Sequence, residues 1–347
     1  MKMTAVIKDK RDKGCQIIET DVPTEVGPKD VLIKILATSI CGTDVHIYKW
    51  DKWSQKRVNP PHIMGHEFSG RVIKVGSEVT RVKVDDLVTA ETHLVCETCE
   101  FCLRGEYHIC ENTKIIGVDI DGCFTEYIVM PEFNIIVNQK DGDPRYLSIQ
   151  EPLGNAVHTM LHFDIVDKNV AVVGCGPIGL MGVNIAKAVG SRKIIAIEVN
   201  PYRIELAKKL GADVVINPKE EDVIARVLEE TNGKGVDVVT EFSGNKSAME
   251  AAFKYVKPGG KMSMLGLTEE DITFDISNDF VFKGVTMYGV VGRLLFETWD
   301  QVKTLIESDR LDLKQIVTHI LPLDEVEKGM EIMMSGNCGK VVLIPNP

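Results

Sequence analysis

Residues 169–190 read NVAVVGCGPIGLMGVNIAKAVG, and this stretch sets the expected fold of the second half of the chain. An apolar run with strand propensity leads into a glycine-rich turn, and the turn opens a segment with helical composition. Glycines stand at positions 174, 176 and 179, in the G-x-G-x-x-G spacing that lets backbone approach a pyrophosphate. The first N–H groups of the following helix would face that anion. The stretch therefore predicts a strand, a phosphate-binding turn and a helix in succession.

The same alternation continues downstream. The strand-like segments are KIIAIEV (193–199), DVVIN (213–217), VDVVTEFSG (236–244), KMSMLGL (261–267) and VTMYGVVG (285–292). The helical segments between them are PYRIELAKKLG (201–211), EDVIARVLEETNG (221–233) and KSAMEAAFKYV (246–256). Apolar strands alternating with amphipathic helices indicate a parallel sheet that is covered on both faces. We therefore expect an α/β fold with a doubly wound Rossmann sheet.

An acidic residue follows the glycine turn at the spacing that a dinucleotide site requires. Glu198 ends the next strand, about 20 residues on, where a carboxylate would meet the hydroxyls of the adenosine ribose. A carboxylate there repels a 2′-phosphate and favours NAD over NADP, although the nearby Arg203 could serve a phosphate. The alternative is a tight strand-to-helix turn without a ligand, with Glu198 as a solvated strand end.

A cysteine-rich loop marks the first half of the chain, where short strand-like runs alternate with turns. The loop reads VCETCEFCLRGEYHIC (95–110) and carries Cys96, Cys99, Cys102 and Cys110. Tetrahedral zinc takes four thiolates, and two-residue gaps let neighbouring cysteines converge on one ion. Four protein ligands leave no position for a substrate, so the predicted role is structural. An iron–sulfur cluster or a redox loop is the alternative.

A second metal site is suggested by the segments SICGTDVHIY and IMGHEFSG. Cys41 offers a thiolate, His66 an imidazole and Glu67 a carboxylate. Three protein ligands plus a water make an open, catalytic zinc site. Taken singly, the cysteine is as readily a small core residue and His-Glu a surface pair, so their convergence is a hypothesis.

Composition narrows the class of protein. The chain has 347 residues, which favours two domains, and a net charge of -11, which argues against nucleic-acid and anionic-membrane partners. No export signal or membrane-spanning apolar segment is evident, so we expect a cytoplasmic location. Thiols stay reduced there, and nine cysteines do not suggest a disulfide framework.

These motifs, in this order, resemble the zinc-dependent medium-chain alcohol dehydrogenases. The segments HIYKWDKWSQ, QEPLGNAVHT and GKVVL extend the similarity through essentially the whole chain and resemble one branch of that family. The resemblance implies a GroES-like β-rich catalytic domain over residues 1–150 and 295–347, which carries two zinc ions. It implies a Rossmann NAD-binding domain over residues 151–294, and a homotetramer.

The resemblance also implies roles for single residues. Cys41, His66 and Glu67 match ligands of the catalytic zinc. Thr43 and His46 match a relay that carries the hydroxyl proton away. The residues that match NAD contacts are Gly174, Gly176, Ile178, Gly179, Glu198, Arg203, Leu265, Gly266, Leu267, Val290 and Val291.

Two further residues match the substrate side, and the substrate follows from the same branch. Glu151 matches an acid that assists the relay, and His93 matches a histidine of the substrate pocket. The branch implies oxidation of L-threonine to 2-amino-3-oxobutanoate, as a step of threonine catabolism. The alternatives are a 2,3-butanediol or polyol dehydrogenase and a non-catalytic nucleotide-binding relative. The remaining cysteines match no ligand and are expected to pack: Cys15, Cys123, Cys175 and Cys338.

Overall fold

The computed structural model describes residues 1–345, which form two compact units. The first unit contains Met1–Pro152 and the chain from Val317 onward, and the second contains Leu153–Ile316. Within the described chain, no helix is long and apolar enough to cross a membrane.

The first unit is built on a seven-stranded sheet in the order β10-β6-β5-β3-β18-β17, with β9 also paired to β3. A three-stranded sheet, β2-β1-β4, and the pair β7-β8 complete its strands. The strands are β1 (Lys2–Lys8), β2 (Gln16–Asp21), β3 (Asp30–Ile40), β4 (His62–Ile63), β5 (Phe68–Val75), β6 (Leu87–Ala90), β7 (His93–Leu94), β8 (Lys114–Ile115), β9 (Tyr127–Pro131), β10 (Ile135–Val137), β17 (Val317–Pro322) and β18 (Lys340–Ile344). The helices are α1 (Gly42–Lys49), α2 (Lys52–Arg57), α3 (Glu100–Leu103), α4 (Pro144–Leu147) and α12 (Val326–Ser335). Helix α5 (Gln150–Leu161) begins at the end of this unit and continues into the second.

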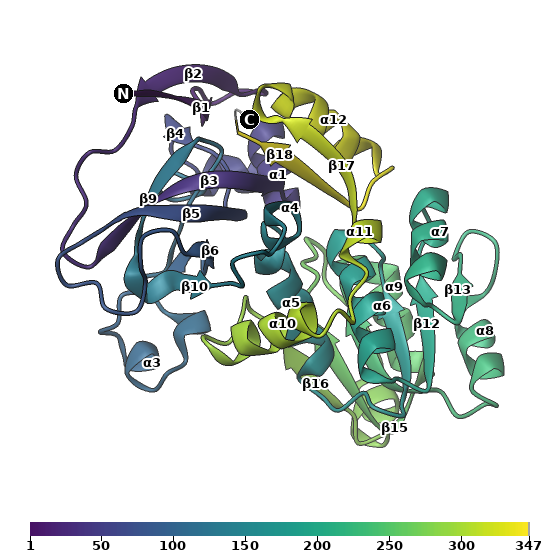
Figure 1. The fold of residues 1–347 in the computed structure, drawn as a ribbon. Helices are drawn as coiled ribbons and strands as arrows, with labels where there is room; N and C mark the ends of the chain where they lie inside the picture. Colours follow the sequence, from purple (N-terminus) through teal and green to yellow (C-terminus); the bar gives the residue numbers. More distant parts are fainter. Residues whose placement is uncertain (346–347) are drawn as a thin grey trace. The chain divides into compact units, whose positions relative to one another are not determined.

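Strand β3 is the centre of the first unit. Its sequence DVLIKILATSI is apolar and rich in β-branched residues, and it is almost wholly buried because it pairs with β5, β9 and β18. The core around it includes Ile33, Ile35 and Phe68, each at most 2% exposed. The C-terminal strand β18, yellow in Figure 1, runs antiparallel to the purple β3, with Val341 opposite Ile40. The last strands of the chain therefore complete a sheet that the first strands begin.

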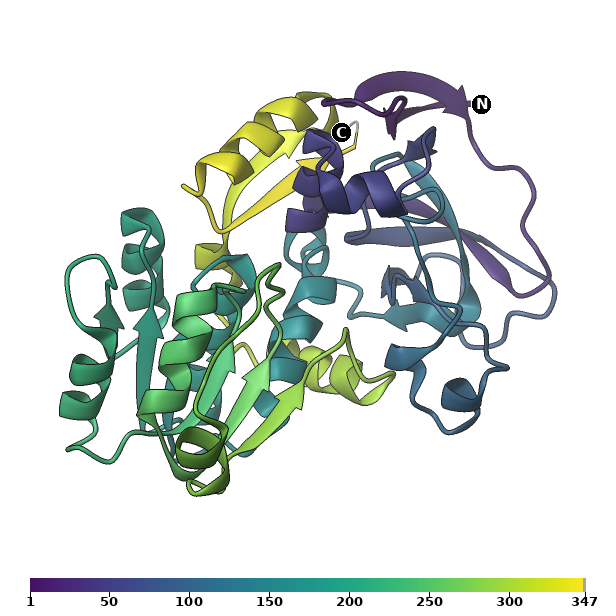
Figure 2. The same ribbon diagram turned by 180° about the vertical axis from the view of Figure 1, so that it is seen from behind.

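The second unit holds a parallel six-stranded sheet in the order β13-β12-β11-β14-β15-β16. Its strands are β11 (Asn169–Val173), β12 (Lys193–Ile197), β13 (Val214–Ile216), β14 (Val236–Glu241), β15 (Val256–Met264) and β16 (Thr286–Gly289). Its helices are α6 (Pro177–Val189), α7 (Pro201–Leu210), α8 (Val223–Glu230), α9 (Lys246–Tyr255), α10 (Glu297–Glu307) and α11 (Leu313–Ile316), with a π-helical turn over Ile276–Val281. Helices lie in front of these strands in Figure 1 and again from behind in Figure 2. Numbered from β11, the order is that of dinucleotide-binding sheets, and the predicted α/β class is confirmed.

Three helices begin beside the carboxyl ends of these strands, and each begins at a side-chain cap. Asn200 accepts a hydrogen bond from the amide of Tyr202 at 2.9 Å and so starts α7. Asp222 and Asn245 start α8 and α9 in the same way. The caps fix the loops between strand and helix, which form the edge of the sheet where ligands bind in this fold.

The boundary of the second unit differs from the predicted one at residue 295. Helices α10 and α11 belong to the second unit, and the return to the first begins only at Val317. Trp299 and Val302 of α10 are buried, and the Asp312 amide donates to Asn184 Oδ1 at 2.8 Å, which ties the segment before α11 to α6. Residues 346–347 of the predicted segment lie outside the described residues.

Candidate active site

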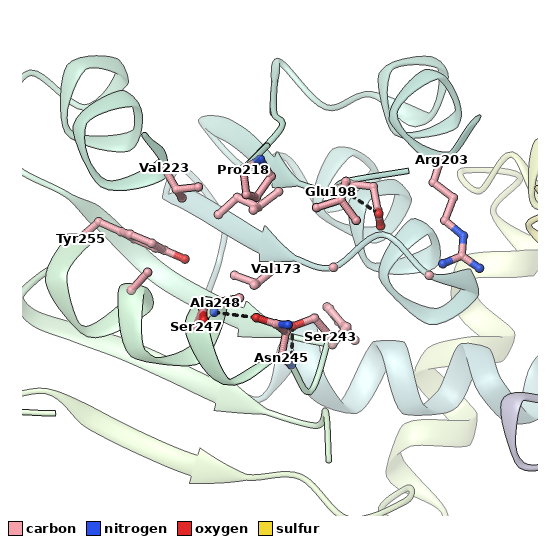
Figure 3. Close-up of a pocket in the computed structure, with 16 residues that line it drawn as sticks. Val173, Glu198, Arg203, Pro218, Val223, Ser243, Asn245, Ser247, Ala248 and Tyr255 are labelled. Atoms are coloured by element: carbon pink, nitrogen blue, oxygen red, sulfur yellow. Dashed lines mark hydrogen bonds between the residues drawn. The ribbon is translucent and has the colours of Figure 1, made fainter. Parts of the chain in front are cut away.

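A pocket of about 480 Å³ lies at the carboxyl edge of the parallel sheet. Loops after β11, β12, β13 and β14, the start of α8 and residues along α9 surround it (Figure 3). The residues that line it include Gly174, Gly176, Glu198, Arg203, Ala248, Ala251 and Tyr255. Two of the predicted cofactor glycines, the predicted acid and the predicted arginine therefore face one cavity.

The three glycines of the turn differ in what a side chain at each position would meet. Gly174 has a φ of +85°, and a Cβ there would lie 2.7 Å from Cβ of Ser243. A Cβ on Gly179 would lie 1.9 Å from the carbonyl oxygen of Gly174, so the turn itself excludes a side chain. Gly176 has neither constraint, because a Cβ there would meet nothing nearer than Arg203 Nη1 at 4.0 Å. The space beside Gly176, at the N-terminus of α6, fits a ligand that approaches the backbone, as a pyrophosphate does.

Glu198 is held in place by backbone amides. Its Oε2 accepts from the Cys175 amide at 2.8 Å, and its Oε1 accepts from the amides of Val199 and Asn200 at 2.7 and 2.8 Å. These bonds fix the carboxylate against the turn, with its side chain on the pocket wall. The Nε of Arg203 is buried without a hydrogen-bond partner in the described chain, so the pocket offers one fixed anion and one cation with spare donor capacity.

The other predicted cofactor residues follow neighbouring strands at the same edge. Leu265 and Gly266 donate their amides to the carbonyl of Glu241 at 3.0 and 3.2 Å, directly after β15. Val290 donates to the Met264 carbonyl at 2.9 Å, directly after β16. The other residues at this edge are Ile178 in the first turn of α6, Leu267, which is 92% exposed, and the half-exposed Val291. All of them therefore lie at the edge that the glycine turn marks.

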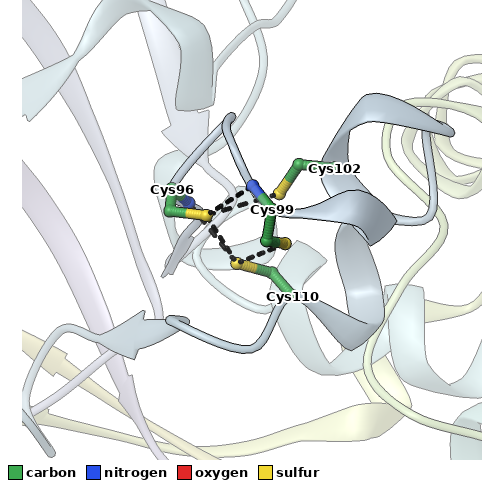
Figure 4. A group of neighbouring side chains, drawn as sticks. All are labelled: Cys96, Cys99, Cys102 and Cys110. Carbon is green, nitrogen blue, oxygen red and sulfur yellow. Dashed lines mark hydrogen bonds between the residues drawn. The ribbon is translucent and has the colours of Figure 1, made fainter.

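The four-cysteine loop brings its thiols together (Figure 4). Its ligand atoms all lie within 4.8 Å of one another, with sulfur–sulfur distances of 3.6 Å for Cys96–Cys110, 3.9 Å for Cys99–Cys110 and 4.0 Å for Cys96–Cys102. Four sulfurs around one tetrahedral zinc would be roughly 3.8 Å apart, given zinc–sulfur bonds of about 2.3 Å. All four cysteines are free thiols, and the geometry is that of a closed metal site.

The electrostatics of this loop also suit a metal. Hydrogen bonds from the backbone and side chain of Thr98 lower the pKa of the Cys96 thiol to about 5, and the amide of Cys99 contributes at 3.3 Å. Burial raises the pKa of Cys102 to about 12, so that thiol would lose its proton only when a cation binds. The loop therefore holds at least one thiolate ready for a metal.

A second cluster joins residues that are distant in the sequence. Ligand atoms of Cys41, His66 and Glu67 lie within 4.8 Å of one another. Cys41 is the N-cap of α1, and His66 and Glu67 directly precede β5. Glu67 is fully buried, and its Oε1 has no hydrogen-bond partner in the described chain. An unsatisfied carboxylate oxygen beside a thiol and an imidazole fits a zinc ion with three protein ligands.

Polar groups around this cluster fix its members. Asp44 accepts from the Cys41 amide at 2.8 Å through Oδ2, and its Oδ1 lies 3.6 Å from His66 Nδ1. Burial of His66 opposes its charge, but Asp44 and the Cys41 sulfur outweigh burial and raise the pKa of His66 well above its usual range. Glu67 accepts from Ser39 and pairs with Lys340, which is 1% exposed and comes from β18.

Helix α1 carries the Thr43 hydroxyl close to Cys41 and the His46 imidazole one turn further along. Thr43 Oγ1 lies 3.8 Å from the sulfur of Cys41, and His46 follows three residues later on the same face of the helix. His46 is exposed, and its Nδ1 pairs with Asp51 Oδ2. Asp51 also caps α2 by accepting from the Ser54 amide at 3.0 Å, so the partner of the imidazole is itself fixed.

Glu151 and His93 do not belong to the cluster of Cys41, His66 and Glu67. Glu151 is 3% exposed in the first turn of α5, and it is not one of the three residues whose ligand atoms converge. His93 begins β7, and its amide donates to Glu91 Oε1 at 3.0 Å. Both residues belong to the first unit, and their roles stay predictions.

Three residues of the site were not predicted from the sequence: Asp44, Asp51 and Lys340. Asp51 had a local signal, because an aspartate before KWSQ is a helix N-cap and follows His46 by five positions. Lys340 had none, because its partner lies 273 positions away and only the pairing of β18 with β3 brings the two together.

Comparisons with known proteins place the chain in a family. The alcohol dehydrogenase GroES-like domain model matches residues 27–140, and the zinc-binding dehydrogenase model matches residues 177–308. The L-threonine 3-dehydrogenase of Caldanaerobacter subterraneus subsp. tengcongensis is 54% identical over 344 residues, and that of Bacillus subtilis is 49% identical over 344 residues. Each alignment covers 99% of this chain and 99% of the relative.

Solved structures give the same result at lower identity. The 2R,3R-butanediol dehydrogenase of Bacillus subtilis superposes with a TM-score of 0.89 at 28% identity, over 99% of this chain and 100% of that one. An alcohol dehydrogenase from Thermus sp. ATN1 superposes with a TM-score of 0.90 at 30% identity, over 98% of this chain and 99% of that one.

Proposed function

Because this chain belongs to the L-threonine 3-dehydrogenases of the zinc-binding dehydrogenase family, we propose that it oxidises the β-hydroxyl of L-threonine and transfers the hydride to NAD. The product is 2-amino-3-oxobutanoate, and the step belongs to threonine catabolism. The enzyme is an oxidoreductase that acts on a CH–OH group. The observation that carries the proposal is the convergence of Cys41 with the buried His66 and Glu67, with the Thr43 hydroxyl beside Cys41.

Cys41, His66 and Glu67 would hold the catalytic zinc. When bound, such an ion lowers the pKa of an alcohol as it lowers that of a water. The Thr43 hydroxyl can accept the substrate proton and pass on its own, because a hydroxyl both donates and accepts. The pairing of His46 Nδ1 with Asp51 leaves Nε2 as the ring nitrogen that takes up the proton and releases it to solvent. Glu151 is proposed to assist this relay, and His93 to line the substrate pocket.

The cofactor is NAD, and the second unit binds it. Glu198 is fixed where it can accept hydrogen bonds from the adenosine ribose hydroxyls, and its charge disfavours a 2′-phosphate. The N-terminus of α6 beside Gly176 and the guanidinium of Arg203 would bind the pyrophosphate. The second zinc is assigned to the four-cysteine loop, where it supports the fold.

The substrate is tested by comparing catalytic efficiencies for L-threonine, L-serine, 2,3-butanediol and sorbitol under identical NAD and zinc. We expect the catalytic efficiency for L-threonine to be clearly higher than that for 2,3-butanediol or sorbitol. A pocket built for an amine and a carboxylate would have unpaired polar groups when a diol or a sugar alcohol is bound. A better rate with butanediol would favour the second candidate, 2,3-butanediol dehydrogenase, which the superposition on the Bacillus subtilis enzyme supports. No turnover with any of them would favour a non-catalytic nucleotide-binding protein.

The assembly and location are proposed on the same basis. We propose a homotetramer in the cytoplasm, with a small-molecule substrate and no nucleic-acid or membrane partner, in keeping with the net charge of -11. Strand β16 supports self-association, because it is the edge of the parallel sheet and its Met287 is 45% exposed. Light scattering of the purified protein tests the tetramer, and a monomer would contradict it.

A further inference from the structure

A buried hydroxyl, that of Tyr255, lies at one end of the nucleotide pocket of the second unit. Tyr255 is the last residue of α9 and lines the pocket, yet it is only 1% exposed. Its hydroxyl has no hydrogen-bond partner among the described residues. Buried side-chain oxygens are rarely left unpaired, because a lost hydrogen bond to water is then not replaced. A ligand that fills the pocket would supply the missing partner.

The two ends of the pocket differ in chemistry. In Figure 3, Arg203 and Tyr255 lie at opposite ends, with Glu198 on the side of Arg203. The wall between them is apolar and includes Val173 and Pro218. A ligand that places its charged part at Arg203 would therefore lay an apolar, flat part along the wall and bring a polar edge to Tyr255.

Small side chains of α9 give access to the tyrosine. Ala248, Ala251 and Tyr255 are spaced by three and four residues, so they lie on one face of the helix, and all three line the pocket. Alanine at the first two positions leaves room for a planar ring above the phenol. A larger residue at either position would close the pocket before it reached the hydroxyl.

The hydroxyl keeps its proton in this environment. Burial raises the pKa of Tyr255, and the carboxylate of Glu241 raises it further. A neutral phenol can donate one hydrogen bond and accept another, so it can pair with either a ring nitrogen or an exocyclic amine of a base.

We propose that the Tyr255 hydroxyl hydrogen-bonds the edge of the adenine base and thereby strengthens the binding of an adenine nucleotide in this pocket. The inference rests on the proposed NAD-binding function and deepens it. The glycine turn, Arg203 and Glu198 would contact only the phosphates and ribose, which other dinucleotides share, whereas Tyr255, which also lines the pocket, would contact the base itself.

The test uses ADP-ribose, which carries the adenine half of NAD and cannot turn over. Titration calorimetry would compare the full-length protein with its Tyr255→Phe variant. We expect the variant to bind ADP-ribose roughly 3- to 10-fold more weakly, because it loses one hydrogen bond. We also expect its ligand-free melting temperature to be no lower than wild type, because the substitution removes an unpaired buried hydroxyl.

Two further variants separate the possible outcomes. Tyr202→Phe removes a hydroxyl from a residue that is 38% exposed and does not line the pocket, so its affinity should equal that of wild type. Ala251→Leu fills the pocket between the apolar wall and Tyr255, and should weaken ADP-ribose binding by at least the same factor. Equal affinities of wild type and Tyr255→Phe would overturn the inference while NAD binding stands, whatever the affinity of Ala251→Leu. A wild-type protein that binds neither ADP-ribose nor NAD would overturn the cofactor assignment as well.

Discussion

The two cysteine-containing clusters of the first unit are built in opposite ways. The four thiols of the loop Cys96–Cys110 come from one short stretch of chain, and two of them are only partly buried. Cys41, His66 and Glu67 come from two segments, and the lysine that pairs with Glu67 comes from the last strand, 273 positions away. The first cluster is local and complete, whereas the second exists only when the whole sheet has formed.

The difference in construction matches the difference between the roles that we propose for the two clusters. Four thiolates occupy every position of a tetrahedral zinc, so the loop can stabilise structure but cannot bind a substrate. Three ligands leave one position open, where a substrate hydroxyl would bind. Changes in the loop should therefore reduce stability, and changes in the second cluster should reduce catalysis.

The largest effect is expected from Cys41→Ser. Serine has nearly the same size but is a much poorer zinc ligand, so kcat/KM for L-threonine should fall by about 10³, or about 4 kcal/mol of transition-state stabilisation. The measurement combines steady-state kinetics with metal content and the melting temperature. Near wild-type activity with full metal content would remove Cys41 from the site.

Cys123→Ser is the matched control for that substitution. Cys123 is buried, burial raises its pKa to about 12, and it belongs to neither ligand cluster. Its substitution should leave both metals in place and kcat/KM within about threefold of wild type, at a cost of about 1 kcal/mol in stability.

Lys340→Met tests the non-local support of the second cluster. Lys340 pairs with Glu67 and donates to the Ile40 carbonyl at 2.7 Å. Removing one partner of a buried ion pair leaves the other uncompensated, so the zinc-free protein should lose about 3 kcal/mol of unfolding free energy. Chemical denaturation of the zinc-free and zinc-loaded proteins measures this loss of unfolding free energy. Added zinc should reduce the loss, because the cation neutralises Glu67.

Lys8→Met provides the comparison for a buried lysine outside the site. Lys8 is fully buried, but its ammonium donates to backbone carbonyls, including that of Gly14 at 2.9 Å. Its substitution should destabilise the protein to the same degree with and without zinc. If zinc rescues both variants equally, the pairing of Lys340 with Glu67 has no special part in the metal site.

Cys102→Ser should separate stability from catalysis in the loop. The variant loses one of four ligands of a closed site, and we expect about 2 kcal/mol less stability and one metal fewer per chain. At a temperature where the variant is still folded, kcat/KM should stay near wild type. A catalytic loss as large as that of Cys41→Ser would show that the two clusters are not functionally separate.

The sequence predicted the local features of the fold well. The alternation of apolar and amphipathic segments after residue 169 indicated the parallel sheet, because each strand and its helix are contiguous. The limits of the units were predicted less well. Helix α10 has an ordinary amphipathic pattern, which shows that one face is buried but not which unit covers it.

The same distinction holds for the site. The spacing of the four cysteines and of the glycine turn is visible in the sequence, because the residues of each motif are close together in the chain. The convergence of Cys41 with His66 and Glu67 depends on the pairing of β3 with β5. The part of Lys340 depends on the pairing of β3 with β18, which is far away in the chain. Residue patterns alone could only suggest that convergence.

The smallest effect is expected from Asp51→Asn, which tests the relay at the edge of the second cluster. Asparagine caps a helix about as well as aspartate, so α2 should keep its N-terminus while His46 loses a charged partner. We expect kcat/KM to fall about fivefold, or about 1 kcal/mol, because the imidazole is less well oriented. The loss should lie in kcat rather than in KM, because the relay acts after the substrate has bound.

The pH dependence of stability gives an independent check on the same pair. Burial alone would raise the pKa of Asp51, but the Ser54 amide and His46 outweigh it, so the net pKa lies below its usual value. A carboxyl with a lowered folded-state pKa stabilises the protein fully above its unfolded-state value and loses that effect as the pH falls through the lowered value. The stability of wild type relative to Asp51→Asn should therefore be constant at higher pH and decline only below about pH 4. If the variant matches wild type in stability at every pH and also retains the wild-type kcat/KM, Asp51 has no part in positioning His46.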